Sequence, residues 1–153
     1  MELSDYQKAF NHSLKLLAIS KRTVRQLYHK LVEKGFNSQA IQEAIESLQE
    51  KKLIDDEEFA KSYVSEKLAT RPTGRVQLEQ VLKRKGIASD LVRKVVGEID
   101  ENYEFNAALK LAQDKAEFLR NLDSIHRKKK VYDFLKRKGF RFSVCRDVIK
   151  QIK

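Results

Sequence analysis

The sequence predicts an all-α protein of three tandem three-helix repeats, stacked into an elongated, curved array. One Pro and five Gly among 153 residues are too few for the turns of an all-β sandwich or barrel. No strand-like alternation of apolar and polar residues runs to a useful length. The pattern Leu-x-x-Lys-Gly followed by a large apolar residue occurs three times, and it ends at Phe36, Ile87 and Phe140.

The chemistry of this pattern is that of helix termination. Gly35, Gly86 and Gly139 can take the left-handed conformation that closes a helix, and Lys in the last turn faces the negative end of the helix dipole. The apolar residue after each Gly is expected to fold back onto the Leu five positions before it. The expected pairs are Phe36 with Leu31, Ile87 with Leu82, and Phe140 with Leu135.

The spacing of the three glycines indicates a repeat. Gly35 and Gly86 are 51 residues apart, and Gly86 and Gly139 are 53 apart. Apolar residues recur six, nine and ten positions after each Gly, which places them on one face of a further helix. We therefore predict repeats over 1–54, 55–99 and 100–153, joined as one continuous array.

Helix signals divide the first repeat into three. The first helix is expected to begin near Ser4 or one residue later, and Ser20 either ends it or caps the next helix. The second helix ends at Gly35. Asn37, or the Ser that follows it, caps the third. The buried stripe of the third helix is Ile41, Ala44, Ile45 and Leu48.

The second repeat opens with four acidic residues. With Asp55 as the N-cap, Glu58 takes the third helical position, as in a capping box, and Ile54 and Phe59 occupy the positions of a hydrophobic staple. Pro72–Gly74 then interrupts the chain. The apolar stripes of the next two helices are Val76, Leu78, Val81 and Leu82, and then Val92, Val95, Val96 and Ile99.

The third repeat is expected to begin near Asp100. Its first helix reaches about residue 120, and Asn121 and Asp123 separate it from the next. The two remaining helices are predicted over about 124–138 and from about 143 to the end.

Composition points to a folded protein with a charged surface. Hydrophobic residues make up 41% of the chain and charged residues 35%, and the net charge is +10. A basic balance of this size favours a polyanionic partner. The single Cys excludes an intramolecular disulfide. No apolar stretch is long enough for a membrane helix, so we expect a cytoplasmic protein with no membrane partner.

No residue pattern points to catalysis. Helix capping accounts for the acidic residues from Asp55 to Glu58, and no His or Cys stands at ligand spacing from them. Cys145 replaces an aliphatic residue at a core position of the repeat, which predicts a buried thiol. There is no phosphate-cradling Gly-rich loop. We therefore expect no enzyme activity, no catalytic residues, no metal and no cofactor.

The basic residues carry the binding hypothesis, and they concentrate in the third repeat. Residues 127–153 hold 11 basic and 2 acidic residues. Such a one-signed excess could follow a phosphate backbone without reading bases. The candidate DNA- or filament-binding residues are Arg127, Lys128, Lys129, Lys130, Lys136, Arg137 and Arg141, with Arg71, Arg75 and Arg25 from the first two repeats.

The sequence also resembles a known family. Residues 53–60 with Tyr63, followed by Arg71-Pro72-Thr73-Gly74 and then Lys85-Gly86-Ile87, are similar to the middle repeat of the bacterial RecX regulatory proteins. The Lys-Gly patterns of the other two repeats fit as well, so the resemblance covers nearly the whole chain.

The resemblance implies a cytoplasmic, non-enzymatic modulator of the RecA recombinase. Such proteins lie along the groove of the RecA–DNA filament. They restrain strand exchange, ATP hydrolysis and coprotease action, and they bind DNA weakly and without sequence preference. We expect the chain to act in this way as a monomer.

Two other functions stay open from the residues alone. One is a stand-alone DNA-binding protein built of helix-turn-helix-like units. The third helix of the first repeat carries Gln42-Glu43 and Glu46-Ser47 rather than an Arg or Asn reading set, which disfavours sequence-specific readout. The other is a helical adaptor for an acidic protein.

Overall fold

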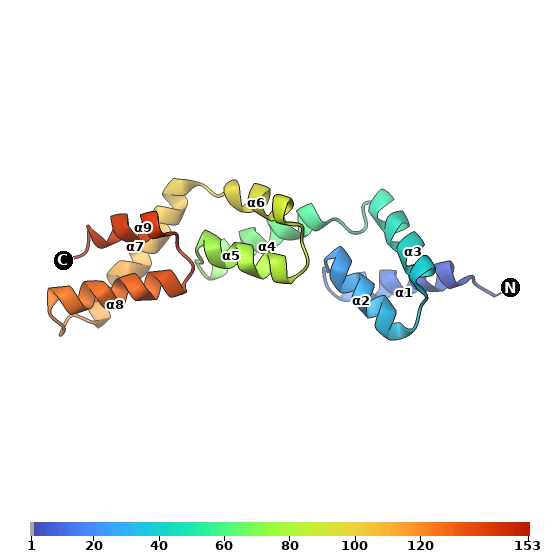
Figure 1. The fold of residues 1–153 in the computed structure, drawn as a ribbon, viewed down its shortest axis with the longest axis horizontal. Helices are drawn as coiled ribbons and strands as arrows, with labels where there is room; N and C mark the ends of the chain where they lie inside the picture. Colours follow the sequence, from blue (N-terminus) through green and yellow to red (C-terminus); the bar gives the residue numbers. More distant parts are fainter. Residues whose placement is uncertain (1) are drawn as a thin grey trace. The chain divides into compact units, whose positions relative to one another are not determined.

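The structure, a computed structural model, describes residues 2–153, which form nine α-helices and no strand (Figure 1). The predicted all-α class is confirmed. The helices are α1 (Asp5–Ile19), α2 (Val24–Lys34), α3 (Ser38–Glu50), α4 (Asp56–Thr70), α5 (Arg75–Arg84), α6 (Ser89–Gly97), α7 (Glu101–Phe118), α8 (Ser124–Arg137) and α9 (Phe142–Ile149).

Most helix starts lie where the sequence predicts them, but the cap of α2 was not predicted. Asn37 and Asp55 cap α3 and α4, because their side chains accept hydrogen bonds from first-turn backbone N–H groups. Ser20 ends α1, and Thr23 rather than Ser20 caps α2. Thr23 and Gln26 form a capping box, with each side chain bonded to the backbone N–H of the other.

All three Lys-Gly turns have the predicted geometry. The φ angles of Gly35, Gly86 and Gly139 are 100°, 95° and 87°, all in the left-handed region. The next residue in each case donates its N–H to the carbonyl of the expected Leu, at 3.2 Å in all three turns. These are Schellman turns, so each Gly ends its helix as the sequence predicts.

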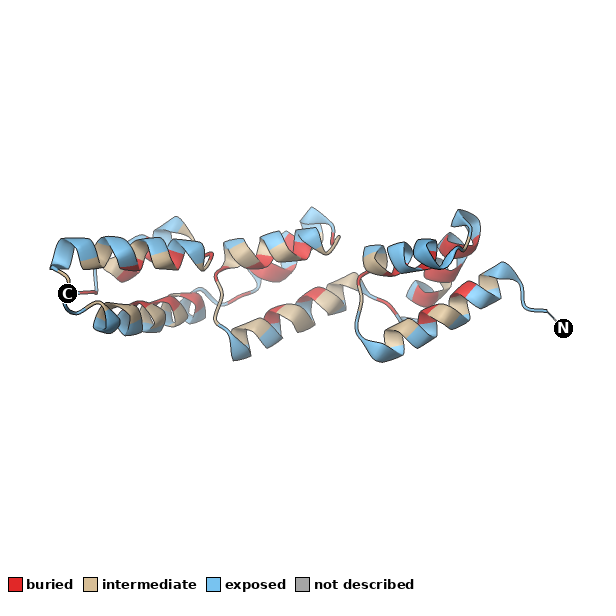
Figure 2. Ribbon diagram, turned by 90° about the horizontal axis from the view of Figure 1, so that it is seen from below, coloured by how far each residue is buried: buried red, intermediate tan, exposed pale blue. Residues whose placement is uncertain are grey.

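The chain divides into two compact units. Unit 1 contains the residues up to Ser62 together with Leu82–Val92, and unit 2 contains Tyr63–Val81 and Arg93–Lys153. In unit 1, α1 packs on α3 and α2 around a core that includes Leu27, Ile41 and Leu48. In unit 2, α7, α8 and α9 contact one another pairwise around a core that includes Val131 and Leu135. Figure 2 shows the buried residues on the sides of these helices that face their neighbours.

Cys145 belongs to the core of unit 2 and is fully buried, as predicted. Burial raises the pKa of its thiol, so the group is neutral and unreactive in this position.

Unit 1 contains the contact between the first and second repeats, which we call the first joint. The Thr23 hydroxyl, at the start of α2, donates to the carbonyl of Lys85 at 2.6 Å. The backbone N–H of Val24 donates to Asp56 Oδ1 at 2.9 Å. The stem of Arg25 lies so close to Gly86 that a Cβ there would be 2.4 Å from Arg25 Cδ. The start of α2 therefore rests on the Lys-Gly turn of the next repeat.

Unit 2 contains the corresponding contact between the second and third repeats, the second joint. The N–H groups of Gly74 and Val76 donate to the carbonyls of Lys138 and Gly139, at 2.9 and 3.0 Å. The two glycine backbones touch, since a Cβ on Gly74 would lie 2.1 Å from the carbonyl carbon of Gly139. The joint therefore requires that position 74 carry no side chain.

A buried ionic cluster completes the second joint. Glu104, which is 3% exposed, forms ion pairs with Arg75, whose Nε lies 2.6 Å from Oε2, and with Arg141, whose Nη2 donates to Oε2 at 3.3 Å. Arg75 also donates to the carbonyl of Ile99. Both guanidinium groups thus neutralise one carboxylate that water barely reaches.

Candidate nucleic-acid interface

Most of the predicted basic residues lie on α8. Lys129, Lys130, Lys136 and Arg137 are exposed, and Lys128 is half-buried. Helical geometry separates them into two flanks. One flank carries Lys128, Lys129 and Lys136, with Tyr132 one turn from Lys128 and from Lys136. The other carries Lys130 and Arg137.

The guanidinium groups of two predicted residues make intramolecular hydrogen bonds. Arg127 donates to the carbonyl of Lys153 from Nε at 3.0 Å and to the carbonyl of Leu122 from Nη1 at 2.8 Å. Arg141 stands at the N-cap position of α9 and bonds to Glu104. Both side chains are therefore partly committed to holding unit 2 together.

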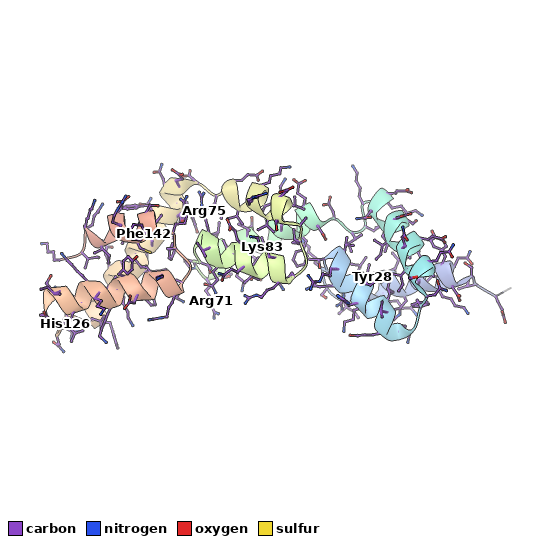
Figure 3. The ribbon with its side chains drawn as sticks, viewed as in Figure 1. Tyr28, Arg71, Arg75, Lys83, His126 and Phe142 are labelled. Atoms are coloured by element: carbon purple, nitrogen blue, oxygen red, sulfur yellow. The ribbon has the colours of Figure 1, made fainter. Side chains whose placement is uncertain are left out.

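The predicted arginines of the first and second repeats differ in their exposure to solvent. The Arg75 side chain is only 11% exposed and is paired with Glu104, so it has no free face for a phosphate. Arg25 is exposed, with its stem across Gly86. Arg71 is exposed just after the end of α4, and Figure 3 shows it away from Arg75 at the start of α5.

The structure brings two predicted residues together in a groove beside the second joint. Arg71, from the segment after α4, and Arg137, from α8, both line a groove of about 450 Å³. We call it the second-joint groove. Its other lining residues are Thr73, Gln77, Lys115, Phe134 and Lys138. The described lining thus carries four cations and no carboxylate.

The ring of Phe134 lies close to two of these cations. The ammonium groups of Lys115 and Lys138 lie 5.1 and 5.7 Å from the centroid of its ring, within the range of cation–π attraction. Among the described residues, none of the four cations of the groove has a carboxylate within 4.0 Å. Their charge is therefore available to an anion, and a phosphodiester backbone fits a groove of this chemistry.

An equivalent groove lies beside the first joint. Ser20, Arg22, Gln26 and Lys85 line it at the positions where Arg71, Thr73, Gln77 and Lys138 line the second. This first-joint groove also contains Glu33, whose carboxylate lies 3.8 Å from Lys30 Nζ. Its positive charge is therefore partly offset, and the second-joint groove is the better anion site.

Sequence reasoning missed Lys115, Lys138 and Phe134 as site residues. The Lys-Gly pattern places Lys138 at the end of a helix, and the structure shows that it also lines the second-joint groove. Lys115 lies on α7, whose own sequence gives no sign that α4, α7 and α8 meet at one groove. The only available signal was the density of charge near residue 138.

Within residues 2–153, no group of three or more His, Cys, Asp and Glu side chains could hold a metal ion. None of the helices described in that range combines the length and the apolar character needed to cross a bilayer.

Comparison with known proteins assigns the repeats. Residues 9–48 match the first three-helix domain of RecX, residues 55–96 the second and residues 101–149 the third. The chain belongs to the RecX family of regulatory proteins. The predicted family and the three-helix repeats are thereby confirmed, while the boundaries at 54/55 and 99/100 stay a prediction.

Individual RecX proteins match over almost the whole chain. Regulatory protein RecX of Clostridium perfringens is 32% identical over 150 residues, covering 97% of this chain and 70% of its own length. Regulatory protein RecX of Prosthecochloris aestuarii is 30% identical over 153 residues, covering 99% and 98%.

Solved RecX structures share the fold. The crystal structure of RecX from Lactobacillus salivarius superposes with a TM-score of 0.93 at 24% identity, covering 97% of this chain and 96% of that one. A second crystal structure of regulatory protein RecX gives 0.86 at 27% identity, covering 99% and 79%.

Proposed function

We propose that this RecX-family protein binds the filament of a RecA-type recombinase and restrains its strand exchange, ATP hydrolysis and coprotease action. The proposal includes weak, sequence-independent binding of DNA by the second-joint groove. The protein acts as a monomer in the cytoplasm, and it catalyses no reaction of its own.

Family membership and one feature of the site support this proposal. The feature that carries it is the second-joint groove, where four cations from three segments of the chain line one groove with Phe134, and no carboxylate is among the described lining residues. Such a groove favours phosphates wherever they occur along a strand, because its cations attract phosphate charge whatever the base. A filament of recombinase on DNA offers phosphates together with protein surface.

The proposal is tested by titrating the protein into a strand-exchange and ATPase assay of the cognate recombinase on single-stranded DNA. The wild-type protein should lower both rates. The double variant Arg71→Gln/Arg137→Gln should need a higher concentration for the same effect. Its log affinity for DNA should also depend less steeply on log salt, by roughly 0.7 per lost phosphate contact on a single strand.

A matched variant distinguishes an effect of the groove on binding from an effect of net charge. Lys8→Gln/Lys15→Gln removes the same charge from exposed positions of α1, and it should behave as wild type. Equal losses in both variants would mean that only total charge matters. If the wild-type protein binds DNA but leaves the recombinase unaffected in several-fold excess, it is a stand-alone DNA-binding protein and the proposal fails.

A further inference from the structure

Phe142 departs from the repeat in a way that the fold does not explain. It lies three residues after Gly139, and the residues three positions after Gly35 and Gly86 are Ser38 and Ser89. Both Ser residues are the first residue of their helix and are exposed, and Phe142 is the first residue of α9. Phe142 is 65% exposed and is not part of the core of unit 2. Packing therefore gives no reason for an aromatic residue here.

The surroundings of Phe142 are aromatic and cationic. Its ring lies 6.4 Å from that of Tyr132 on α8, at an interplanar angle of 78°. The guanidinium carbon of Arg146 lies 5.8 Å from the ring centroid. Figure 3 shows Phe142 at the start of α9, on the side toward α8. We call Phe142, Tyr132 and Arg146 the aromatic platform.

Cations flank the platform along α8. Lys128 and Lys136 each stand four residues from Tyr132, so all three lie on one face of the helix, one turn apart. Among the described residues neither lysine has an ion-pair partner. The spacing thus places the half-buried ring of Tyr132, against which Phe142 lies, between two positive charges.

This combination matches the chemistry of an unpaired nucleotide. Nucleobases stack on aromatic rings and on guanidinium planes, and each such stack contributes roughly 1–3 kcal/mol by alanine substitution. The phosphates on either side of a stacked base need cations within reach. In a duplex the base faces are already stacked on one another, so the platform can take bases only from a single strand.

We propose that Phe142 stacks a nucleobase of a single-stranded nucleic acid, while Lys128 and Lys136 bind the adjoining phosphates. The inference rests on the proposed function, because it assigns the part of the surface that meets unpaired DNA. It adds a preference for single strands that the second-joint groove, which holds phosphates alone, does not supply.

The test compares variants of the full chain by fluorescence anisotropy on an oligothymidylate and on a duplex of equal length. Phe142→Ser installs the residue of the other two repeats, so the fold should be kept, as a urea unfolding curve would verify. Its affinity for the single strand should fall about 5- to 150-fold. The salt slope should stay unchanged because no charge is lost, and duplex affinity should also be unchanged.

Two further changes at position 142 separate stacking from general apolar contact. Phe142→Tyr keeps an aromatic face and should bind the single strand as wild type does. Phe142→Leu keeps apolar area without that face and should lose most of the affinity. Ile125→Ser removes a 79% exposed apolar side chain elsewhere on α8 and should change nothing.

The outcomes distinguish this inference from the proposed function. Wild-type affinity in Phe142→Ser or in Phe142→Leu overturns the stacking role, and so does an equal loss on duplex DNA. If Phe142→Ser keeps single-strand affinity but inhibits the recombinase less, the ring contacts protein and the inference fails. The proposed function itself fails only if the wild-type protein does not act on the recombinase.

Discussion

The two joints bring equivalent backbone segments together, but different chemical groups make the contacts in each. Position 23 of the first repeat corresponds to position 74 of the second, and each bonds to the carbonyl of the Lys in the next Lys-Gly turn. The first joint uses a Thr hydroxyl, and the second uses the N–H of Gly74. Asp56 and Glu104 correspond as well, since each stands four residues before a buried Ala of its helix. The geometry of the joint therefore belongs to the repeat, while the side chains that fix it can change.

The difference lies in burial. Asp56 is half-buried and accepts one backbone N–H, whereas Glu104 is almost fully buried between two guanidinium groups. Buried ion pairs are costly to break, because removal of one partner leaves the other charge desolvated. The second joint, which builds the more basic groove, should thus be the more sensitive of the two to substitution.

The largest effect is expected at Glu104. Glu104→Ala leaves Arg75 buried without a counter-charge and should lower the free energy of unfolding by about 3–5 kcal/mol, as measured by urea denaturation. The double variant Arg75→Met/Glu104→Leu removes both charges and should cost much less. If the single and double variants are equally destabilised, the ion pair does not hold the joint.

The second-largest effect is expected when a residue of one joint replaces its equivalent in the other. Gly74→Thr introduces the residue of the first joint, but its Cβ would collide with the backbone of Gly139. The loss of unfolding free energy should reach about 3 kcal/mol. Because this backbone contact holds Arg71 beside Lys138, DNA affinity should fall too. Gly97→Ala, where a Cβ meets nothing within 4 Å, is the control and should be neutral. A tolerated Thr at position 74 would show that the two backbones can separate.

A smaller loss is expected at Thr23. Thr23→Val removes both the cap of α2 and the hydrogen bond to Lys85, and should cost about 1–2 kcal/mol. Thr23→Ser keeps both hydrogen bonds and should cost little. Thermal unfolding of the two variants in parallel measures the difference, and equal losses would assign the effect to the Thr methyl group instead.

The smallest expected effect is the contribution of Asp56 to the pH dependence of stability. Burial, helped by the charge of Asp55, raises the pKa of Asp56, against the opposing hydrogen bond from Val24. A raised pKa favours folding while the group is protonated, below its unfolded value of about 3.9, and this benefit is lost as pH rises through the folded value. Asp56→Asn should therefore become more stable relative to wild type as pH rises toward about 7, by less than about 0.5 kcal/mol. Urea midpoints at several pH values test the trend, and an opposite trend would mean that the carboxylate is favoured in the joint.

Local signals explain why the helices and turns were predictable. A Schellman turn or an N-cap is decided by a few neighbouring residues, so the Gly and Asn positions identify it from the sequence alone. The repeat spacing then gives the number of units without knowledge of how they pack.

The joints and the groove depend on residues far apart in the chain. Nothing near Asp56 indicates that it accepts the N–H of Val24, and the sequence explains its charge equally well by capping. As a candidate binding residue Arg75 is expected to be exposed, but its side chain is nearly buried and pairs with a single acid from the next repeat. Charge density indicates a part of the chain that is rich in cations, and only the packing of α4, α7 and α8 decides which of them line one groove.

The openness of the first Lys-Gly turn has an evolutionary consequence. A Cβ on Gly35 would meet nothing within 4 Å, whereas one on Gly86 would strike Arg25 and one on Gly139 would lie 2.6 Å from the backbone nitrogen of Gln77. Selection therefore acts on Gly35 through its dihedral angle alone, and on the other two glycines through dihedral angle and space together. Asn, which tolerates a left-handed φ, should replace the first glycine among relatives far more often than it replaces the second or third.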